Sequence, residues 1–125
     1  MGHPSRAEPE VVIVVDDDPD VLSSLKFAFE IEGFRVQTHA SAEALLDGAA
    51  LPDHGCLVLD QQMPGLNGLA LLQRLRERGH KLPAVLITTP SPALEQQAAA
   101  AGVTIVEKPL TCDTLVSRVR ELLRS

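Results

Sequence analysis

Five consecutive β-branched residues, Val11 to Val15, constrain the fold of this chain more than any other segment. A strand with one face in water alternates apolar and polar side chains, so an unbroken apolar run is typical of a strand buried on both faces. Such strands occur mainly in parallel sheets that carry helices on either side. Asp18 and Pro19 follow the run and are typical of a helix N-cap and of the first helical position. This segment therefore predicts a strand that leads directly into a helix.

The same unit, an apolar run followed by a helical pattern, recurs four more times along the chain. The predicted strands are 11–15, 34–38, 57–60, 84–88 and 103–106, and the predicted helices are 18–33, 41–48, 67–79, 91–102 and 111–123. The second strand is the most polar, so we expect it near an edge of the sheet. Five strands in strict alternation with five helices predict an α/β fold with a parallel sheet covered on both faces.

Size and composition fit one small domain and exclude some function classes. Hydrophobic residues make up 45% of the 125 residues, but with three Phe and neither Tyr nor Trp the core is expected to be aliphatic. The formal net charge of −6 argues against a nucleic-acid-binding surface, which needs clustered Lys and Arg. Arginines that gather late in two predicted helices are interpreted as solvated helix faces: Arg74, Arg76, Arg78, Arg118, Arg120 and Arg124.

The remaining features predict a simple domain organisation. Residues 1–10 are expected to be a flexible leader, and residues 11–124 the folded domain. Cys56 and Cys112 match no metal or redox spacing, and Cys56 is expected to be a small buried residue. The four histidines are scattered, with no pair at helical metal-ligand spacing. Neither a transmembrane run nor a signal peptide is recognisable, so we expect a soluble cytoplasmic protein.

Polar residues follow four of the predicted strands at their carboxyl ends, where parallel α/β sheets bind ligands. They are Asp16 and Asp17 after the first strand, Asp60 on the third, Thr88 on the fourth and Lys108 shortly after the fifth. Carboxylates in one crevice repel each other unless a cation is present, and an all-oxygen site suits Mg²⁺. With a lysine and a hydroxyl nearby, such a site can bind a phosphoryl group and let a carboxylate attack it.

Each of these residues also has a simpler interpretation. An aspartate after a strand is often only a helix cap, which is the preferred interpretation of the neighbouring Asp18. Lys108 alone is best interpreted as a solvated loop lysine, and Thr88 alone as an ordinary strand-end residue. The functional interpretation depends on the combination of residues, in this order and at these strand ends.

Four segments resemble the receiver domain of two-component response regulators, and the resemblance covers residues 11–123. The segments are Val-Val-Asp-Asp-Asp-Pro-Asp-Val at 14–21, Leu-Val-Leu-Asp-Gln-Gln-Met-Pro-Gly-Leu-Asn-Gly at 57–68, Leu-Ile-Thr at 86–88 and Glu-Lys-Pro at 107–109. The resemblance implies a flavodoxin-like, doubly wound (βα)5 fold whose five-stranded parallel sheet has the order 2-1-3-4-5. It also implies a phosphoacceptor that assists its own phosphorylation and dephosphorylation, rather than an enzyme.

By this resemblance, Asp60 is the phosphoacceptor. Mg²⁺ is held by Asp16, Asp17 and Asp60, together with the backbone carbonyl of Gln62. The implied phosphodonor is a sensor histidine kinase or a phosphotransfer protein.

The resemblance also implies how the phosphoryl group is held and read. Thr88 matches the switch hydroxyl that moves to meet the phosphoryl group, and Lys108 matches the lysine that pairs with the acyl phosphate. The output is usually a changed surface on the fourth helix, fifth strand and fifth helix, recognised by an output domain or a target protein. A weak homodimer is a further expectation, whereas neither nucleic acid nor a membrane is an expected partner of this domain.

The sequence departs from the family pattern at three places. Thr89 follows the switch threonine, where Ala or Gly is usual, and is expected to narrow access to the phosphoryl group. Ile105 stands where an aromatic residue usually signals by ring rotation. The stretch between the switch threonine and the lysine is about two residues short. Because it contains Pro90 and Pro92, we expect a short or displaced fourth helix.

Two other functions fit parts of the sequence. The atypical Thr89 and Ile105 fit a phosphate-independent, receiver-like interaction module, although the acidic pair, Asp60 and Lys108 argue against it. The segment from Asp18 to Val21 weakly resembles the Asp-x-Asp start of haloacid-dehalogenase-type phosphatases, which usually need a larger core and a cap. The aspartate that becomes phosphorylated distinguishes this phosphatase from a receiver.

Overall fold

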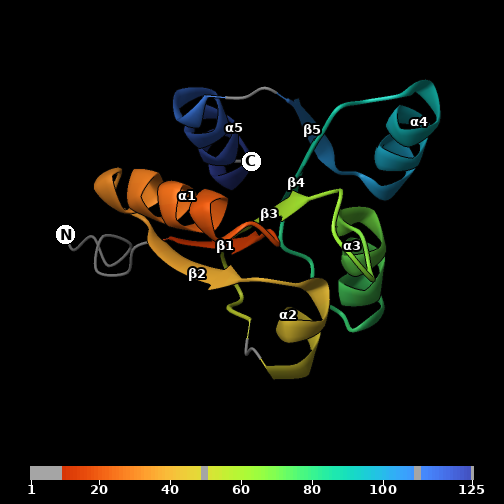
Figure 1. Ribbon diagram of the computed structural model, residues 1–125, viewed down its shortest axis with the longest axis horizontal. Coiled ribbons are helices and arrows are strands. Elements are labelled where there is room, and N and C mark those ends of the chain that lie inside the picture. Colours follow the sequence, from red (N-terminus) through yellow and green to blue (C-terminus); the bar gives the residue numbers. More distant parts are fainter. Residues whose placement is uncertain (1–9, 49–50, 109–110, 125) are drawn as a thin grey trace.

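The computed structural model describes residues 10–48, 51–108 and 111–124, in which five strands alternate with five helices (Figure 1). The strands are β1 (Val11–Val15), β2 (Arg35–His39), β3 (Cys56–Asp60), β4 (Ala84–Thr88) and β5 (Thr104–Glu107). The helices are α1 (Pro19–Ile31), α2 (Ala42–Gly48), α3 (Gly68–Glu77), α4 (Pro92–Ala101) and α5 (Cys112–Arg124). Residues 1–9, nearly all of the predicted leader, lie outside the described residues.

The five strands form one parallel sheet in the order β2-β1-β3-β4-β5, as predicted. Residues 12–15 of β1 are buried, in agreement with their unbroken apolar run. The more polar β2 lies at an edge and is only half-buried or exposed. Because β1 pairs with β2 on one side and β3 on the other, the strand order reverses between β1 and β3. Ligands bind outside the carboxyl ends of strands at such a reversal.

Helices cover both faces of the sheet, and each face has its own aliphatic cluster (Figure 1). On one face, Phe29 of α1 and Leu115 of α5 belong to a buried cluster with Val14 and Val58 of the sheet. On the other face, the apolar side chains of α2, α3 and α4 form a second cluster with Ile13. The predicted aliphatic core is therefore confirmed, and it consists of two layers.

The alternation of side chains along the strands decides which residues face α1 and α5. Val58 of β3, Ile87 of β4 and Val106 of β5 belong to the cluster beneath α1 and α5. Asp60, two residues after Val58 on β3, lies on this face by the same alternation, and Lys108 follows directly after the end of β5. The side chains directly before and after these residues on the same strands face α2, α3 and α4 instead.

The predicted helix starts are confirmed at their caps. Asp18 Oδ1 accepts a hydrogen bond from the main-chain N–H of Asp20 at 2.9 Å, and Pro19 is the first residue of α1. Ser91 caps α4, which spans ten residues from Pro92 and is as long as α3. Pro92 takes the first helical position, where its missing N–H removes no helical bond. The expectation of a short fourth helix was therefore wrong, because the two prolines of this stretch leave a helix as long as α3.

Two strands begin one residue later than predicted. The N–H of Phe34 donates to the carbonyl of Phe29 at 3.1 Å, and the N–H of Val103 donates to the carbonyl of Ala98 at 3.0 Å. Both amides therefore belong to the turns that close α1 and α4. A β-branched or aromatic residue directly after a helix-ending glycine is easily assigned to the strand, because its side chain is apolar in either case.

Candidate functional site

A pocket lies at the carboxyl ends of the strands, on the face covered by α1 and α5. Its lining residues are Asp16, Asp17, Asp18, Asp20, Val21, Ser24, Leu25, Asp60, Gln62, Ile87, Thr89, Lys108 and Cys112. Six of the eight predicted site residues are therefore brought together around one pocket. The other two, Thr88 and Ile105, do not line it.

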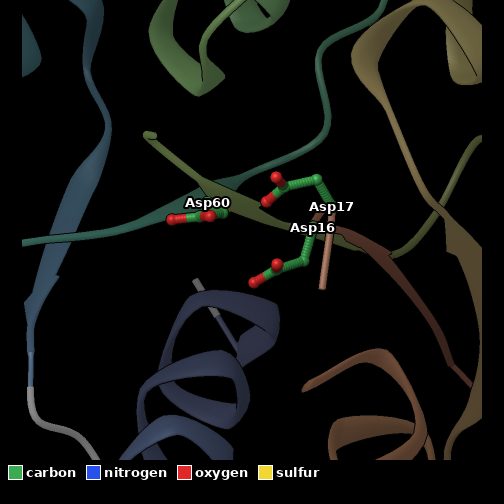
Figure 2. Close-up of side chains that lie close together, drawn as sticks. All are labelled: Asp16, Asp17 and Asp60. Carbon is green, nitrogen blue, oxygen red and sulfur yellow. The ribbon is translucent and has the colours of Figure 1, made fainter. Parts of the chain in front are cut away.

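Three carboxylates meet in this pocket (Figure 2). One oxygen each from Asp16, Asp17 and Asp60 lies within 4.8 Å of the other two. Asp16 and Asp60 are 7% and 5% exposed, whereas Asp17 is exposed. Asp16 is fixed by two hydrogen bonds, because its N–H donates to the carbonyl of His39 at 3.1 Å and its Oδ1 accepts from the N–H of Asp18 at 2.9 Å.

The electrostatics of Asp16 reflect this crowding. Burial raises the pKa of the Asp16 carboxyl above its ordinary value, and the negative charges of Asp60 and Asp17 raise this pKa further. The hydrogen bond from the Asp18 N–H and the charge of Lys108 lower the same pKa without reversing the net shift. Burial is thus the main cause of the raised pKa, and the two neighbouring carboxylates add to it.

Lys108 contacts the buried carboxylate of Asp60. Its Nζ lies 3.2 Å from Asp60 Oδ1, and the Lys108 side chain is 39% exposed against 6% for Asp60. The main-chain N–H of Lys108 donates to the carbonyl of Thr88 at 3.0 Å, which places the lysine beside the end of β4. Asp60 Oδ1 also accepts from the N–H of Gln62 at 3.4 Å. Two donors therefore converge on one carboxylate oxygen.

Gly68 lets α3 begin directly against the phosphoacceptor candidate. A Cβ at Gly68 would lie 2.6 Å from the carbonyl oxygen of Asp60 and 2.7 Å from Cδ1 of Leu86, closer than real Cβ contacts allow. The later glycine of the motif at 57–68 thus has a steric reason. The start of α3 can pack against β3 only without a side chain here.

Thr88 and Ile105 do not line this pocket, and the alternation of side chains along β4 and β5 assigns them to the other face of the sheet. The Thr88 side chain is 1% exposed, and its hydroxyl donates to the carbonyl of Thr89 at 3.3 Å. Ile105 packs against the cluster beneath α2, α3 and α4, and it lines a separate groove between α4 and β5. Side-chain alternation accounts for both positions, since Ile87 and Val106, one residue out of phase with them, face α1 and α5.

Several pocket residues were not predicted. Ser24, on α1, and Cys112, the first residue of α5, line the pocket. The sequence offers no signal for them beyond their places in these helices. The other cysteine, Cys56, is buried as predicted, and burial raises the pKa of its thiol to about 12. Cys56 is therefore a packing residue rather than a nucleophile.

Comparison with known proteins decides the family. The family model described as the response regulator receiver domain matches residues 12–120, which include every residue of the acidic cluster and Lys108. The chain belongs to this family. It is thus a receiver domain of two-component systems, as the sequence motifs predicted, and receiver domains are phosphoacceptors rather than classical enzymes.

Relatives of this receiver domain include transcriptional regulators. The transcriptional regulatory protein FixJ of Azorhizobium caulinodans is 36% identical over 114 residues, covering 90% of this chain and 54% of FixJ. The transcriptional regulatory protein TdiR of Thauera aromatica is 36% identical over 125 residues, covering 98% of this chain and 55% of TdiR. This chain therefore spans about half the length of these curated relatives.

Solved structures give the same result for the receiver fold. The crystal structure of FixJ-N has a TM-score of 0.78 and 34% identity, and it covers 93% of this chain and 94% of that one. The structure of the response regulator StyR has a TM-score of 0.83 and 32% identity, covering 93% of this chain and 60% of that one. Among the helices that the structure describes, none is long and apolar enough to span a bilayer.

Proposed function

We propose that this receiver domain accepts a phosphoryl group on Asp60 from a sensor histidine kinase or a phosphotransfer protein, and that it acts as a phosphorylation-controlled switch. The observation that carries the proposal is the place of the Asp60 carboxylate. It is 5% exposed yet lines a pocket, with two further aspartates and Lys108 around it. A carboxylate in such a place can act as a nucleophile toward an anionic group.

The donor set fits Mg²⁺. Carboxylate oxygens of Asp16, Asp17 and Asp60 would hold the ion, together with the main-chain carbonyl of Gln62. Hard oxygen ligands with room for waters are those that Mg²⁺ prefers, and the exposed side of the pocket at Asp17 leaves that room. When bound, Mg²⁺ would supply positive charge that offsets the carboxylates and the phosphoryl oxygens.

The other steps of the proposed phosphoryl transfer depend on side chains of this domain. An oxygen of Asp60 forms the bond to phosphorus while the bond from phosphorus to the donor's histidine nitrogen breaks, and the electron pair of that bond stays on the nitrogen. Lys108, already 3.2 Å from Asp60, pairs with the new acyl phosphate. The Thr88 hydroxyl has to leave the carbonyl of Thr89 to reach the same group. This exchange of partners supplies a physical difference between the two states of the switch.

The proposed switch has one partner before the phosphoryl transfer and another after it. The phosphodonor is the upstream partner. An output domain or a target protein is the downstream partner, in keeping with relatives that are about twice as long as the segment they share with this chain.

Intact mass spectrometry after incubation with Mg²⁺ and acetyl phosphate tests the proposal. We expect one added phosphoryl group that requires Mg²⁺ and is lost in Asp60→Asn. Asp18→Asn is the matched control, because Asp18 lines the same pocket and an asparagine can still cap α1. Loss of the phosphoryl group in Asp18→Asn with retention in Asp60→Asn would favour the phosphatase interpretation. A folded protein that is never phosphorylated, by acetyl phosphate or by histidine kinases, would favour the phosphate-independent interaction module.

A further inference from the structure

The first main-chain N–H groups of α3 donate hydrogen bonds mainly to Gln61, the residue that follows Asp60. The first N–H groups of a helix have no partner within the helix. The N–H of Gly68 donates to the main-chain carbonyl of Gln61 at 3.2 Å, and the N–H of Leu69 donates to Gln61 Oε1 at 2.8 Å. The N–H of Ala70 donates to Asn67 Oδ1 at 2.8 Å. Gln61 therefore holds two of these amides, and the N-cap Asn67 holds the third.

Gln61 is itself held at three points. Its N–H donates to the carbonyl of Ile87 at 3.0 Å, its carbonyl accepts from Gly68, and its side chain accepts from Leu69. With main-chain donor, main-chain acceptor and side chain all bonded, the backbone at Gln61 has little freedom left. The next N–H, of Gln62, donates to Asp60 Oδ1 at 3.4 Å. The course of the chain at Gln62 is thus set by Gln61 on one side and Asp60 on the other.

We infer that Gln61 is a positioning residue, which fixes the main-chain carbonyl of Gln62 for the Mg²⁺ site through its hydrogen bond to the start of α3. This inference rests on the proposed function, because that function makes the Gln62 carbonyl a metal ligand. Gln61 is half-buried and does not line the pocket, whereas Gln62 does, so Gln61 acts through its neighbour. Removing a hydrogen bond that orients a metal ligand typically weakens metal binding by about 10- to 100-fold.

A pair of matched variants tests this role. Gln61→Met keeps the length of the side chain and removes the acceptor for Leu69. Asn67→Ala removes an equally short bond to the same helix end, but Asn67 is not adjacent to a proposed ligand. Isothermal titration calorimetry with MgCl2 gives the dissociation constant of each protein, and urea unfolding followed by circular dichroism gives its stability.

We expect both variants to be less stable than the wild type, and only Gln61→Met to bind Mg²⁺ about tenfold more weakly. An unchanged Mg²⁺ dissociation constant in Gln61→Met would overturn the inference. Equal weakening in the two variants would also overturn it, because loss of helix capping alone would then explain the effect. A wild-type protein that binds no Mg²⁺ at all would instead refute the metal site of the proposed function, and the inference with it.

Discussion

Lys108 Nζ lies 3.2 Å from Asp60 Oδ1, so a cation that follows β5 reaches a carboxylate at the end of β3, two strands away. The lysine side chain is 39% exposed, while that of Asp60 is 6% exposed. Because the Lys108 ammonium lies partly in water, it can exchange one anionic partner for another at a lower cost than a lysine whose charge is fully buried. This pair therefore suits a lysine that changes its partner from a carboxylate to a phosphoryl group.

We predict that Lys108→Met slows phosphorylation of Asp60 by acetyl phosphate at least about tenfold, because a cation directed at the transferred group is lost. The same change removes a positive charge next to three carboxylates, so Mg²⁺ affinity should stay the same or rise. Intact mass time courses and calorimetric Mg²⁺ titrations measure the two effects. Lys81→Met is the control, since Lys81 is exposed and precedes β4 at the opposite end of the sheet. Parallel losses of rate and Mg²⁺ affinity would contradict this role for Lys108.

Thr89 lines the pocket and is exposed. We predict that Thr89→Ala shortens the lifetime of the phosphoryl group on Asp60 several-fold, because a smaller side chain in the pocket lining gives water easier access to the acyl phosphate. The carbonyl that accepts from Thr88 belongs to the main chain and is kept in this variant. Decay of the phosphorylated fraction, followed by intact mass after removal of the donor, measures the lifetime. Thr104→Ala, on β5 but outside the pocket, should decay like the wild type; equal decay in Thr89→Ala would refute the steric argument.

The fold could be predicted from the sequence because the local signals agreed with one another. The unbroken apolar run of β1 indicated burial on both faces, and caps such as Asp18 and Asn67 marked the helix starts. The acidic cluster was also predictable, since the carboxyl ends of parallel strands meet at one edge. The position of the Thr88 hydroxyl was not predicted, because being at a strand end does not say which face a side chain takes. Counting alternate residues back from Thr88 would have assigned its side chain to the face of α2, α3 and α4, and not to the face that carries the Asp60 side chain.

The close approach of α3 to Asp60 makes Gly68 a critical position. We predict that Gly68→Ala lowers the free energy of unfolding by about 1–3 kcal/mol, because its Cβ would overlap a main-chain carbonyl that cannot move aside easily. Circular dichroism during urea unfolding measures the free energy of unfolding, since the chain has neither Tyr nor Trp for fluorescence. At Gly48 an added Cβ meets nothing within 4 Å. Gly48→Ala should therefore be neutral or stabilising by at most about 1 kcal/mol, and a similar loss in both variants would contradict the packing argument.

The last residue of β2 should make stability depend on pH. Burial lowers the pKa of His39 below its ordinary value of 6.5, because the charged imidazolium is poorly solvated there. Between the lowered pKa and 6.5, the unfolded chain binds more protons at this position than the folded chain does. The free energy of unfolding therefore rises with pH across this window, and the contribution of His39 is fully present above 6.5.

Replacing His39 by a residue that does not titrate isolates this contribution. We predict that His39→Gln loses less stability than the wild type when the pH falls from about 7.5 to about 5. Urea unfolding curves at intervals across this range measure the difference between the two slopes. Because Asp16 and the other histidines are present in both proteins, their own pH dependence cancels in the comparison. Identical slopes would mean that the folded protein accepts a proton on His39 as readily as the unfolded chain does, which is incompatible with desolvation at the end of β2.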